Sequence, residues 1–571
     1  MPETLDYDYV IIGSGFGGSV SALRLSEKGY KVLVLEKGKK YEGKDFPKSN
    51  WVLNRWLWLP GLKFFGIMKM TFFRHVSILS GVGVGGGSLV YANTLPIPKD
   101  YFFKSKSWSH LADWKTELLP FYDLARKMLG TAKNPRLEKG DLALQELGKQ
   151  IGKGNHFEPT DVAIFFGEPN RTVPDPYFNG EGPERTGCNF CGGCMIGCKH
   201  NSKNTLDKNY LYLAQKKGAE ILPEKEVYDV KPLNGNDGST GYRIFWREST
   251  KFFGKRGEIT TRGVIFSGGV LGTVDLLLKL KKSSLPNLSN KLGTGIRTNS
   301  ESIIPITSLD KKSVYSDGIA IGSILHTDDH SHLEPVRYSE GSGFWRLLLL
   351  PLVDGRNNFV RFFKLIYDFF RHPIQNLKVM FTDDWSKRTQ VLLFMQSLES
   401  TLRFKRGLFG MGSSMDTGEA PKAFIPEAVQ LAKSFSQIIG GKPTVLANEA
   451  ILGIPSTAHI LGGAIMGKDV QEGVIDKENH VFGYENMLVC DGSMISANIG
   501  VNPSLTSRRE CPFDASSDTA AESWDDHWFG VRRIRSAICA QMPGTSSASS
   551  SQCSQISSLK SQSLTRNDGL E

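Results

Sequence analysis

Three glycines and one acid near the N-terminus have the spacing of a nucleotide-binding turn. Gly13, Gly15 and Gly18 form the pattern G-x-G-x-x-G, and Glu36 follows about 20 residues later. In this pattern the first glycine permits a tight turn, the second lets the backbone approach a pyrophosphate, and the third lets a helix pack on a strand. Free N–H groups at the start of the helix can bind phosphate, and the carboxylate can accept from ribose hydroxyls. The pattern predicts an adenine dinucleotide, which could be NAD or FAD.

A second glycine-rich run bears on the choice of cofactor. It reads Gly81-Val-Gly-Val-Gly-Gly-Gly-Ser-Leu-Val-Tyr-Ala-Asn93. Consecutive glycines allow backbone N–H groups to form an anion-binding concavity and to pass close to a flat ring. One such loop suffices for NAD, whereas an extended FAD with its isoalloxazine benefits from two. The run therefore favours FAD, and its alternative interpretation is a tight turn between core strands.

Four cysteines fall within one short stretch. Cys188, Cys191, Cys194 and Cys198 have the spacing C-x2-C-x2-C-x3-C. This spacing can wrap an iron–sulfur cluster, although Lys199 stands where a proline often follows. Four thiolates could instead close a tetrahedral zinc site, and unligated or disulfide-linked cysteines are the third possibility. A cluster near a flavin would make electrons leave singly to a carrier; without one, the flavin could react directly with oxygen.

The elements around these motifs follow from the apolar pattern. A strand should end just before Gly13, a helix should follow over Ser19–Lys28, and Lys31–Leu35 should form a second strand. Further along, 226–248 and 257–267 are rich in strand-forming residues, and a helical stretch follows at Thr273–Lys282. Gln390–Met395 is another apolar strand-like run.

Two segments combine aromatic and basic residues. From Phe46 to Lys99 there is no Asp or Glu but there are many aromatics, and a second block runs from Phe344 to Arg371. Such a composition suits an interfacial segment on anionic lipid, or a lid or core helix over an apolar pocket. Both interpretations indicate an apolar substrate.

Composition restricts the setting of the protein. The 571 residues can hold more than one domain, and 40% hydrophobic with 22% charged residues is ordinary for a globular protein. The formal charge of +10 comes without a nucleic-acid-binding module, so an anionic surface is the expected partner. No apolar run approaches the ~20 residues of a spanning helix, and eight cysteines are too few for a disulfide scaffold. We expect a cytoplasmic protein that is able to lie at a membrane surface.

Taken together, the motifs resemble those of the glucose-methanol-choline (GMC) oxidoreductases, in particular the bacterial cholesterol-oxidase-like branch. Besides the two glycine runs, the resemblance rests on Ala458-His-Ile-Leu-Gly-Gly463, Val489-Cys-Asp-Gly-Ser493 and Gly500-Val-Asn-Pro-Ser-Leu-Thr506. Ser267–Gly272 and a stretch from Asn290 to Glu301 also match. The resemblance covers roughly residues 5–506.

The resemblance implies FAD as cofactor and a pair of catalytic residues. His459 matches the family's catalytic histidine, the proton acceptor, and Asn502 matches its partner, which positions the substrate oxygen or the flavin. An imidazole suits this role because its pKa of about 6.5 lies near the working pH. Tyr91 is expected near the isoalloxazine. The implied cofactor-binding residues are Gly13, Gly15, Phe16, Gly18, Glu36, Gly83, Gly86, Gly87, Ser88, Asn93, Asp491 and Gly492.

Sterol oxidases of this kind also use a glutamate to move a proton during double-bond isomerisation. Glu399 lies near the matching region but several residues off the matching position, so we favour a solvated strand residue there. Oxidation is therefore predicted more firmly than isomerisation.

The resemblance implies an α/β plus α+β fold: an FAD-binding Rossmann-type domain with a substrate domain on a mostly antiparallel sheet. We expect the FAD-binding domain at 1–100, 190–300 and 455–506, and the substrate domain with its lid segments at 101–189 and 301–454. After Thr506 the family continues into an apolar helix, but here the chain reads Ser507-Arg-Arg-Glu-Cys-Pro-Phe513. Residues 507–571 are therefore an atypical tail that we expect to be disordered.

The leading functional hypothesis is FAD-dependent oxidation of a bulky apolar alcohol, above all a sterol 3-hydroxyl, with oxygen or another electron acceptor. The second is a long-chain alcohol or sugar dehydrogenase that passes electrons through a cluster at Cys188–Cys198. The third belongs to another class: a flavin-binding protein with weak or no catalysis because of its altered C-terminus.

Overall fold

A computed structural model of the protein describes residues 4–353, 355, 358–408 and 410–506. The predicted tail at 507–571 lies outside the described residues, and so does the departure from the family pattern that begins at Ser507. Within the described part of the chain, no helix is both long enough and apolar enough to cross a membrane.

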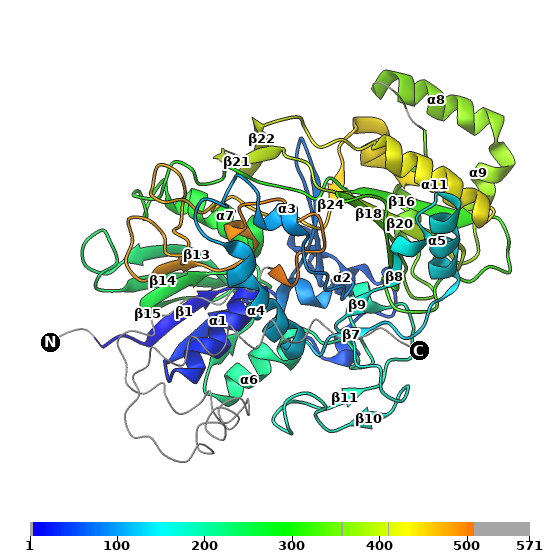
Figure 1. The fold of residues 1–571 in the computed structure, drawn as a ribbon. Coiled ribbons are helices and arrows are strands. Elements are labelled where there is room, and N and C mark those ends of the chain that lie inside the picture. The colour runs from blue at the N-terminus through cyan, green and yellow to red at the C-terminus, as the bar shows by residue number, and fades with distance from the viewer. Residues whose placement is uncertain (1–3, 354, 356–357, 409, 507–571) are drawn as a thin grey trace, which may run out of the picture. The chain divides into compact units, whose positions relative to one another are not determined.

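The first sheet has seven strands and contains the N-terminal strand (Figure 1). Its order is β12-β2-β1-β15-β14-β13, and β25 pairs with β15. The pairs around β1, β2, β12 and β25 are parallel, whereas β13, β14 and β15 pair antiparallel. β2 is buried at every residue, as expected of a parallel strand covered on both faces. The strands are β1 (Tyr7–Ile12), β2 (Val32–Leu35), β12 (Glu220–Leu222), β13 (Lys225–Pro232), β14 (Tyr242–Glu248), β15 (Arg256–Phe266) and β25 (Met487–Val489).

Three helices pack on or beside this sheet. They are α1 (Phe16–Glu27), α6 (Tyr210–Lys216) and α7 (Gly269–Leu280). α1 contacts α6 and the strands β1 and β2, so the expected strand–turn–helix–strand unit is confirmed. The predicted strands at 226–248 and 257–267 are confirmed as β13 to β15. The helix predicted from Thr273 is confirmed as well, but it begins four residues earlier, at Gly269.

The second sheet also has seven strands, and it is antiparallel throughout. Its order is β19-β23-β16-β20-β18-β17-β8. The apolar run Gln390–Met395 forms most of the central strand β20, as the sequence predicts. The strands are β8 (Phe157–Pro159), β16 (Ser302–Ser308), β17 (Ser323–His326), β18 (Ser331–Val336), β19 (Leu349–Pro351), β20 (Thr389–Gln396) and β23 (Gly441–Leu446).

The two faces of the second sheet have different neighbours. Helices α5 (Lys139–Gln150) and α11 (Pro426–Ile438) pack on one face, and Figure 1 shows both beside β16, β18 and β20. Leu333 of β18 belongs to the apolar cluster under these helices. Side chains alternate between faces along a strand, so His332 and Glu334 project from the opposite face. This opposite face carries the polar residues of the candidate site.

A small sheet links the glycine-rich run to the C-terminal motifs. Its order is β24-β6-β5, with β24 (Ser456–Thr457) parallel to β6 (Ser77–Gly81) and β5 (Met68–Phe72) antiparallel to β6. β6 ends at the first residue of the glycine-rich run, and β24 ends two residues before His459. The pairing therefore holds His459 beside the second glycine loop.

The two segments rich in aromatic and basic residues differ in how far they are buried. Trp56 from the first block is fully buried and packs edge-on against Phe344 and Trp345, so much of that block is core. The second block forms α8 (Asn358–Arg371), which α9 (Pro373–Met380) follows, and Figure 1 shows the two helices beyond α11. Most apolar side chains of α8 are exposed.

The remaining elements are short or lie between the sheets. The helices are α2 (Leu53–Trp56), α3 (Asp100–Phe103), α4 (Trp114–Met128) and α10 (Trp385–Arg388). The strands are β3 (Trp58–Leu59), β4 (Phe64–Phe65), β7 (Ala132–Lys133), β9 (Asp161–Val162), β10 (Thr172–Val173), β11 (Arg185–Thr186), β21 (Thr401–Gly407) and β22 (Gly410–Thr417).

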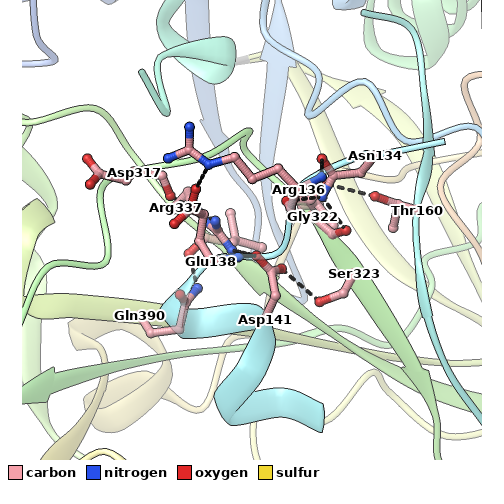
Figure 2. A network of polar contacts seen from close by, with 12 residues as sticks. Asn134, Arg136, Glu138, Asp141, Thr160, Asp317, Gly322, Ser323, Arg337 and Gln390 are labelled. Atoms are coloured by element: carbon pink, nitrogen blue, oxygen red, sulfur yellow. Dashed lines mark hydrogen bonds and ion pairs between the residues drawn. The ribbon is translucent and has the colours of Figure 1, made fainter. Parts of the chain in front are cut away.

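A buried ion pair fastens α5 to the second sheet (Figure 2). The Arg337 guanidinium donates to the Asp141 carboxylate at 2.7 Å, and both side chains are at most 1% exposed. Asp141 also accepts from the Ser323 hydroxyl at 2.7 Å and from the Glu138 backbone N–H at 2.9 Å. A second Arg337 nitrogen donates to the Asp317 carbonyl. Each charge thus depends on its partner, because neither can be solvated.

Removing one partner should leave a buried charge uncompensated. We predict that Asp141→Ala lowers the free energy of unfolding by about 3–5 kcal/mol, as measured by chemical denaturation. The matched control is Asp100→Ala, which breaks the exposed pair with Lys115 and should change stability far less. Equal destabilisation by the two variants would contradict the structural role of Asp141.

Candidate active site

The carboxyl ends of β1, β15 and β25 meet so closely that only glycine fits between them. Gly13 has φ +106°, and a Cβ atom there would lie 2.3 Å from the Ser267 carbonyl oxygen. At Gly17, in the first turn of α1, a Cβ atom would lie 1.7 Å from the Cys490 carbonyl oxygen. Gly18 is equally closed by the Gly13 carbonyl. The close approach fixes the start of α1 over the sheet edge where dinucleotides bind in such folds.

The second glycine-rich run lies directly on this first turn. A Cβ atom at Gly86 would be 2.7 Å from the Gly15 Cα atom. The Ser14 hydroxyl accepts from the Gly85 N–H at 3.1 Å, which ties the two loops together. No side chain caps the N-terminus of α1, so the first N–H groups of that helix can take a pyrophosphate.

The cradle places several other predicted cofactor residues. The ring of Phe16 makes an edge-to-face contact with Tyr91 at 5.8 Å, which brings the predicted isoalloxazine neighbour to the start of α1. The buried amide of Asn93 has no nitrogen or oxygen partner, and the Cys194 thiol lies near it. The Ser88 hydroxyl is engaged within the protein, between the Gly85 carbonyl and the Leu206 N–H.

Glu36 lies at the end of β2 with its carboxylate buried beside the turn. One oxygen accepts from the Ser14 N–H and hydroxyl at 3.1 and 2.7 Å, and the other accepts from the Gly38 N–H at 2.8 Å. These bonds orient the carboxylate and leave it further lone pairs for a ribose hydroxyl.

Asp491 has a different set of contacts. Its carboxylate accepts from the Ser493 N–H at 2.8 Å and from the Thr273 hydroxyl at 2.6 Å. It thereby caps a short 3-10 helix at Gly492–Met494 and joins it to α7. Burial raises the pKa of Asp491.

A histidine–glutamate pair forms the second part of the site. His459 Nδ1 lies 2.6 Å from Glu301 Oε1, and the Glu301 side chain is completely buried. Glu301 also accepts from the Thr457 hydroxyl and the Ala458 N–H. Burial lowers the pKa of His459, but the Glu301 carboxylate outweighs burial, and the net direction is upward. Because Nδ1 is held by Glu301, Nε2 is the nitrogen left for a substrate.

Asn502 and Glu334 complete this part of the site. The Asn502 side-chain amide donates to Glu334 Oε2 at 3.5 Å, while Asn502 Oδ1 and Glu334 Oε1 have no hydrogen-bond partner. Burial raises the pKa of Glu334 to about 8, and the nearby His459 opposes this rise. Orphaned, buried polar atoms are costly unless a ligand or water meets them. The arrangement is that of a site open to a polar substrate group.

Sequence reasoning missed Glu334. The sequence gives little signal there: Glu334 is the single acid of β18, a strand of mixed composition whose six residues are all buried in the structure. The candidate that the sequence offered, Glu399, lies exposed in the loop between β20 and β21, outside the site. The preference for a solvated residue at Glu399 is thus confirmed, although the residue is in a loop and not a strand.

The cysteine stretch does not form the predicted metal site. Cys188, Cys191, Cys194 and Cys198 are free thiols around a small cavity of about 190 Å³. Among the described residues, no three His, Cys, Asp or Glu side chains are placed to hold a metal ion. Burial raises the pKa of Cys188 to about 12. The iron–sulfur and zinc interpretations are therefore not supported.

A buried lysine gives this stretch a structural role. Lys203 donates to the carbonyls of Leu89, Tyr91 and Cys194 at 2.8–3.0 Å. Burial lowers its pKa to about 7. The lysine thus joins the cysteine stretch to the second glycine loop, and the stretch supports the back of the cofactor cradle.

The fold and the two-part site define an oxidoreductase built on a Rossmann-type dinucleotide-binding domain. A model of the NAD(P)-binding Rossmann-like domain matches residues 11–42, and a model described as GMC oxidoreductase matches residues 439–507. The chain is 44% identical to a cholesterol oxidase of Acinetobacter baumannii, over 88% of this chain and 92% of that protein. It is 41% identical to a cholesterol oxidase of Mycobacterium tuberculosis, over 91% of each.

More distant matches agree with this assignment. A long-chain-alcohol oxidase of Arabidopsis thaliana is 23% identical over 87% of this chain and 65% of that protein. The crystal structure of pyridoxine 4-oxidase from Mesorbium loti has the same fold, with a TM-score of 0.56, 14% identity, and coverage of 88% of this chain and 97% of that one. The chain belongs to the GMC oxidoreductase family, whose members are FAD-dependent enzymes that act on CH–OH groups. The uncapped start of α1 and the touching glycine loops fit that cofactor.

The pairing of His459 with Glu301 predicts a measurable shift. Glu301→Gln removes the negative charge that raises the pKa of His459, so this pKa should fall below its wild-type value. NMR titration of isotope-labelled histidines would measure the change, with His459→Gln identifying the signal. Glu301→Asp, which keeps the charge, should retain most of the elevation. An unchanged His459 pKa in Glu301→Gln would contradict the pairing.

Proposed function

We propose that the protein is a cholesterol-oxidase-like enzyme that oxidises the 3-hydroxyl of a sterol. The observation that carries the proposal is the group of His459, Asn502 and Glu334 beside a flavin cradle, with polar atoms left free for one substrate oxygen. The similarity to the cholesterol oxidases of two bacteria supports a sterol over other alcohols.

The residues of the site have separable roles in this reaction. Nε2 of His459 accepts the hydroxyl proton, and Glu301 orients the ring and stabilises the positive charge that forms on it. The amide of Asn502 positions the substrate oxygen so that the C–H bond faces the cofactor. FAD, when bound between the two glycine loops, supplies the acceptor for the hydride.

Glu334 suits the movement of a carbon-bound proton. Once the alcohol is a ketone, shifting the neighbouring double bond requires a group that removes a proton from one carbon and returns it to another. A carboxyl group with a pKa of about 8 exchanges protons readily in both directions near neutral pH. We therefore assign isomerisation to Glu334 and not to Glu399.

Molecular oxygen is the electron acceptor that fits the site best. The alternative dehydrogenase required a metal cluster at Cys188–Cys198, and the described residues give that cluster no support. The similarity to two bacterial cholesterol oxidases favours oxygen as the acceptor.

Anaerobic mixing with cholesterol tests the reaction. Flavin-loaded protein should lose its flavin absorption band with cholesterol, and to a smaller extent with a long-chain alcohol at the same concentration. Glu334→Gln should still bleach but should yield a ketone whose double bond is not conjugated, as ultraviolet absorption would show. A bound flavin that does not bleach would exclude the sterol, and a conjugated product from Glu334→Gln would exclude the role of Glu334.

We further propose that α8 and α9 dock on an anionic bilayer from which the sterol is taken. Arg361 and Asp368 fasten α8 to the protein: Arg361 donates to the Ala450 carbonyl, and Asp368 pairs with Lys442 at 2.8 Å. The apolar side chains point away from these anchors. Exposed members are Phe359, Phe362, Phe363, Ile366, Tyr367, Phe369, Phe370, Ile374, Leu377, Met380 and Phe381.

The charge of α8 and α9 favours an anionic bilayer over an uncharged protein surface as their partner. Apart from the buried anchor Arg361, α8 and α9 carry three basic side chains and one acidic side chain, and the acid is already paired with Lys442. An amphipathic helix with aromatic and basic residues is typical of the boundary between headgroups and acyl chains. The partner is thus a membrane with anionic lipid.

Vesicle binding distinguishes a specific membrane-binding surface from non-specific hydrophobic adsorption. A triple variant, Phe359→Ser, Phe363→Ser and Phe370→Ser, should reduce co-sedimentation with phosphatidylserine-containing vesicles by at least about tenfold. The reason is that three aromatic rings no longer become buried in the bilayer. Oxidation of detergent-dispersed sterol should persist. The control replaces Phe252 and Phe253, which are 93% and 94% exposed elsewhere, and should leave vesicle binding intact. Equal losses in both variants, or equal binding to neutral phosphatidylcholine vesicles, would contradict the proposal.

A further inference from the structure

A polar cavity of about 300 Å³ lies beside Glu334, and the chemistry assigned above leaves it without a role. Glu334, His332, His326 and Glu158 line it along one face of the second sheet, and Val501, next to Asn502, lines it as well. A cavity of this size has room for several waters, each of about 30 Å³. It therefore offers a polar route between the buried site and the outer strands.

The strand register explains why these side chains form a row. His332 and Glu334 are two residues apart on β18 and project from the same face. His326 of β17 lies directly opposite His332 in the antiparallel pair. Glu158 of the edge strand β8 lies opposite Ile324, two residues before His326, and so shares that face too. The row crosses the sheet from an inner strand to its edge.

The side chains of the row lie close together, and their exposure rises steadily toward the edge strand. His332 Nε2 lies 3.8 Å from Glu334 Oε1, the two imidazole centroids are 5.9 Å apart, and His326 Nε2 lies 3.8 Å from Glu158 Oε1. The two nitrogen–oxygen separations of 3.8 Å are too long for direct hydrogen bonds, and a water to one side of each pair can contact both partners. The side chains of Glu334, His332, His326 and Glu158 are 0, 3, 24 and 53% exposed, so the row runs from the interior to solvent.

The polar atoms of the row lack protein partners where they face one another. Glu334 Oε1, His332 Nε2 and His326 Nδ1 are all buried without a hydrogen bond. Burial lowers the pKa of His332 to about 3, so its ring is neutral near pH 7. A neutral imidazole can accept a proton at one nitrogen and release one from the other. Apolar residues would be cheaper to bury at these positions than two histidines.

The proposed oxidation needs such a route. When an alcohol becomes a ketone, the carbon loses a hydride to the cofactor and the oxygen loses a proton to the protein. A route to solvent lets that proton leave the buried site, and the reduction of oxygen to hydrogen peroxide later takes up one proton. One proton is thus released and one is taken up in each catalytic cycle, so the net reaction neither produces nor consumes protons.

We propose that His332 and His326 form a proton route that connects Glu334 with solvent at Glu158. Water joins the three gaps, and each histidine passes the proton from one ring nitrogen to the other. His332 and His326 are thus relay residues that do not touch the substrate. The proposal rests on the proposed oxidation for its biological use, but the route itself can be tested without substrate.

Other charged groups around the cavity influence the pKa values of the two histidines but do not lie on the proposed route. Lys99 faces both histidines and lowers the pKa of each, and Glu158 opposes this effect at His326. Arg126 and Asp161 neutralise one another across 2.6 Å at the rim. Further titratable or charged neighbours are Tyr101, His156, Lys133, Glu301, Asp329, His330 and His459.

The first experiment follows proton exchange in the resting protein. The protonated Glu334 carboxyl has an infrared band that shifts when its proton is replaced by deuterium, and Glu334→Gln identifies the band. After transfer to D₂O at a pH below 8, the shift should be complete at once in wild type. It should be slowed at least about tenfold in His332→Phe, which fills similar space but carries no proton. Equal exchange rates would overturn the proposal.

The second experiment compares proton release with flavin bleaching after anaerobic mixing with cholesterol. In wild type, a pH-indicator dye should report release in step with bleaching. In His332→Phe, release should lag behind bleaching, and added imidazole should shorten the lag. The control is His330→Phe, which changes another histidine of the same cavity that bonds Ser397, off the route.

The outcomes separate the two proposals. Failure of wild type to bleach would count against the sterol reaction, while the exchange experiment would still decide the route. Release in step with bleaching in His332→Phe would overturn the route and leave the sterol reaction standing. If His332→Phe does not fold, His326→Phe breaks the row one step further out and should give the same lag.

Discussion

The close approach of backbone at Gly13, Gly17 and Gly86 is the constraint on which the rest of the site depends. Side chains are excluded there because carbonyl or Cα atoms already lie within 3 Å of each missing Cβ atom. The contact holds the first helix, the second glycine loop and the strand end at Cys490 in one place. The pyrophosphate and ring of a cofactor can approach this backbone only because the glycines have no side chains to block them.

The reactive side chains are positioned by pairings that lie far apart in the sequence. β24 pairs with β6 and so holds His459 beside the second glycine loop, and Glu301 fixes its ring from the start of β16. Glu334 comes from a different sheet, through the register of β18 against β20. The chemistry therefore arises where the small sheet that holds His459 meets the second sheet, which carries Glu334.

The sequence predicted the parts whose signals are local. Gly13 to Glu36 forms a contiguous strand–turn–helix–strand pattern, and His459 and Asn502 lie in short motifs with recognisable neighbours. Glu334 was missed because its role arises from strand pairing across many residues, and one acid in a short strand of mixed composition does not reveal its partners. The spacing of Cys188 to Cys198 allowed a metal cluster as one interpretation. Spacing alone, however, does not show where the loop directs its thiols. The buried Lys203 beneath that loop shows that its described contacts are structural.

The central claim is that one substrate oxygen lies between His459 and Asn502, with Glu334 beside the neighbouring carbons. A crystal structure of the flavin-loaded protein with a sterol bound would test this most directly. We predict that the 3-oxygen lies within hydrogen-bond distance of His459 Nε2 and of the Asn502 side chain, with the Glu334 carboxyl against the same ring. A sterol bound with its hydroxyl group away from His459 and Asn502 would contradict the account.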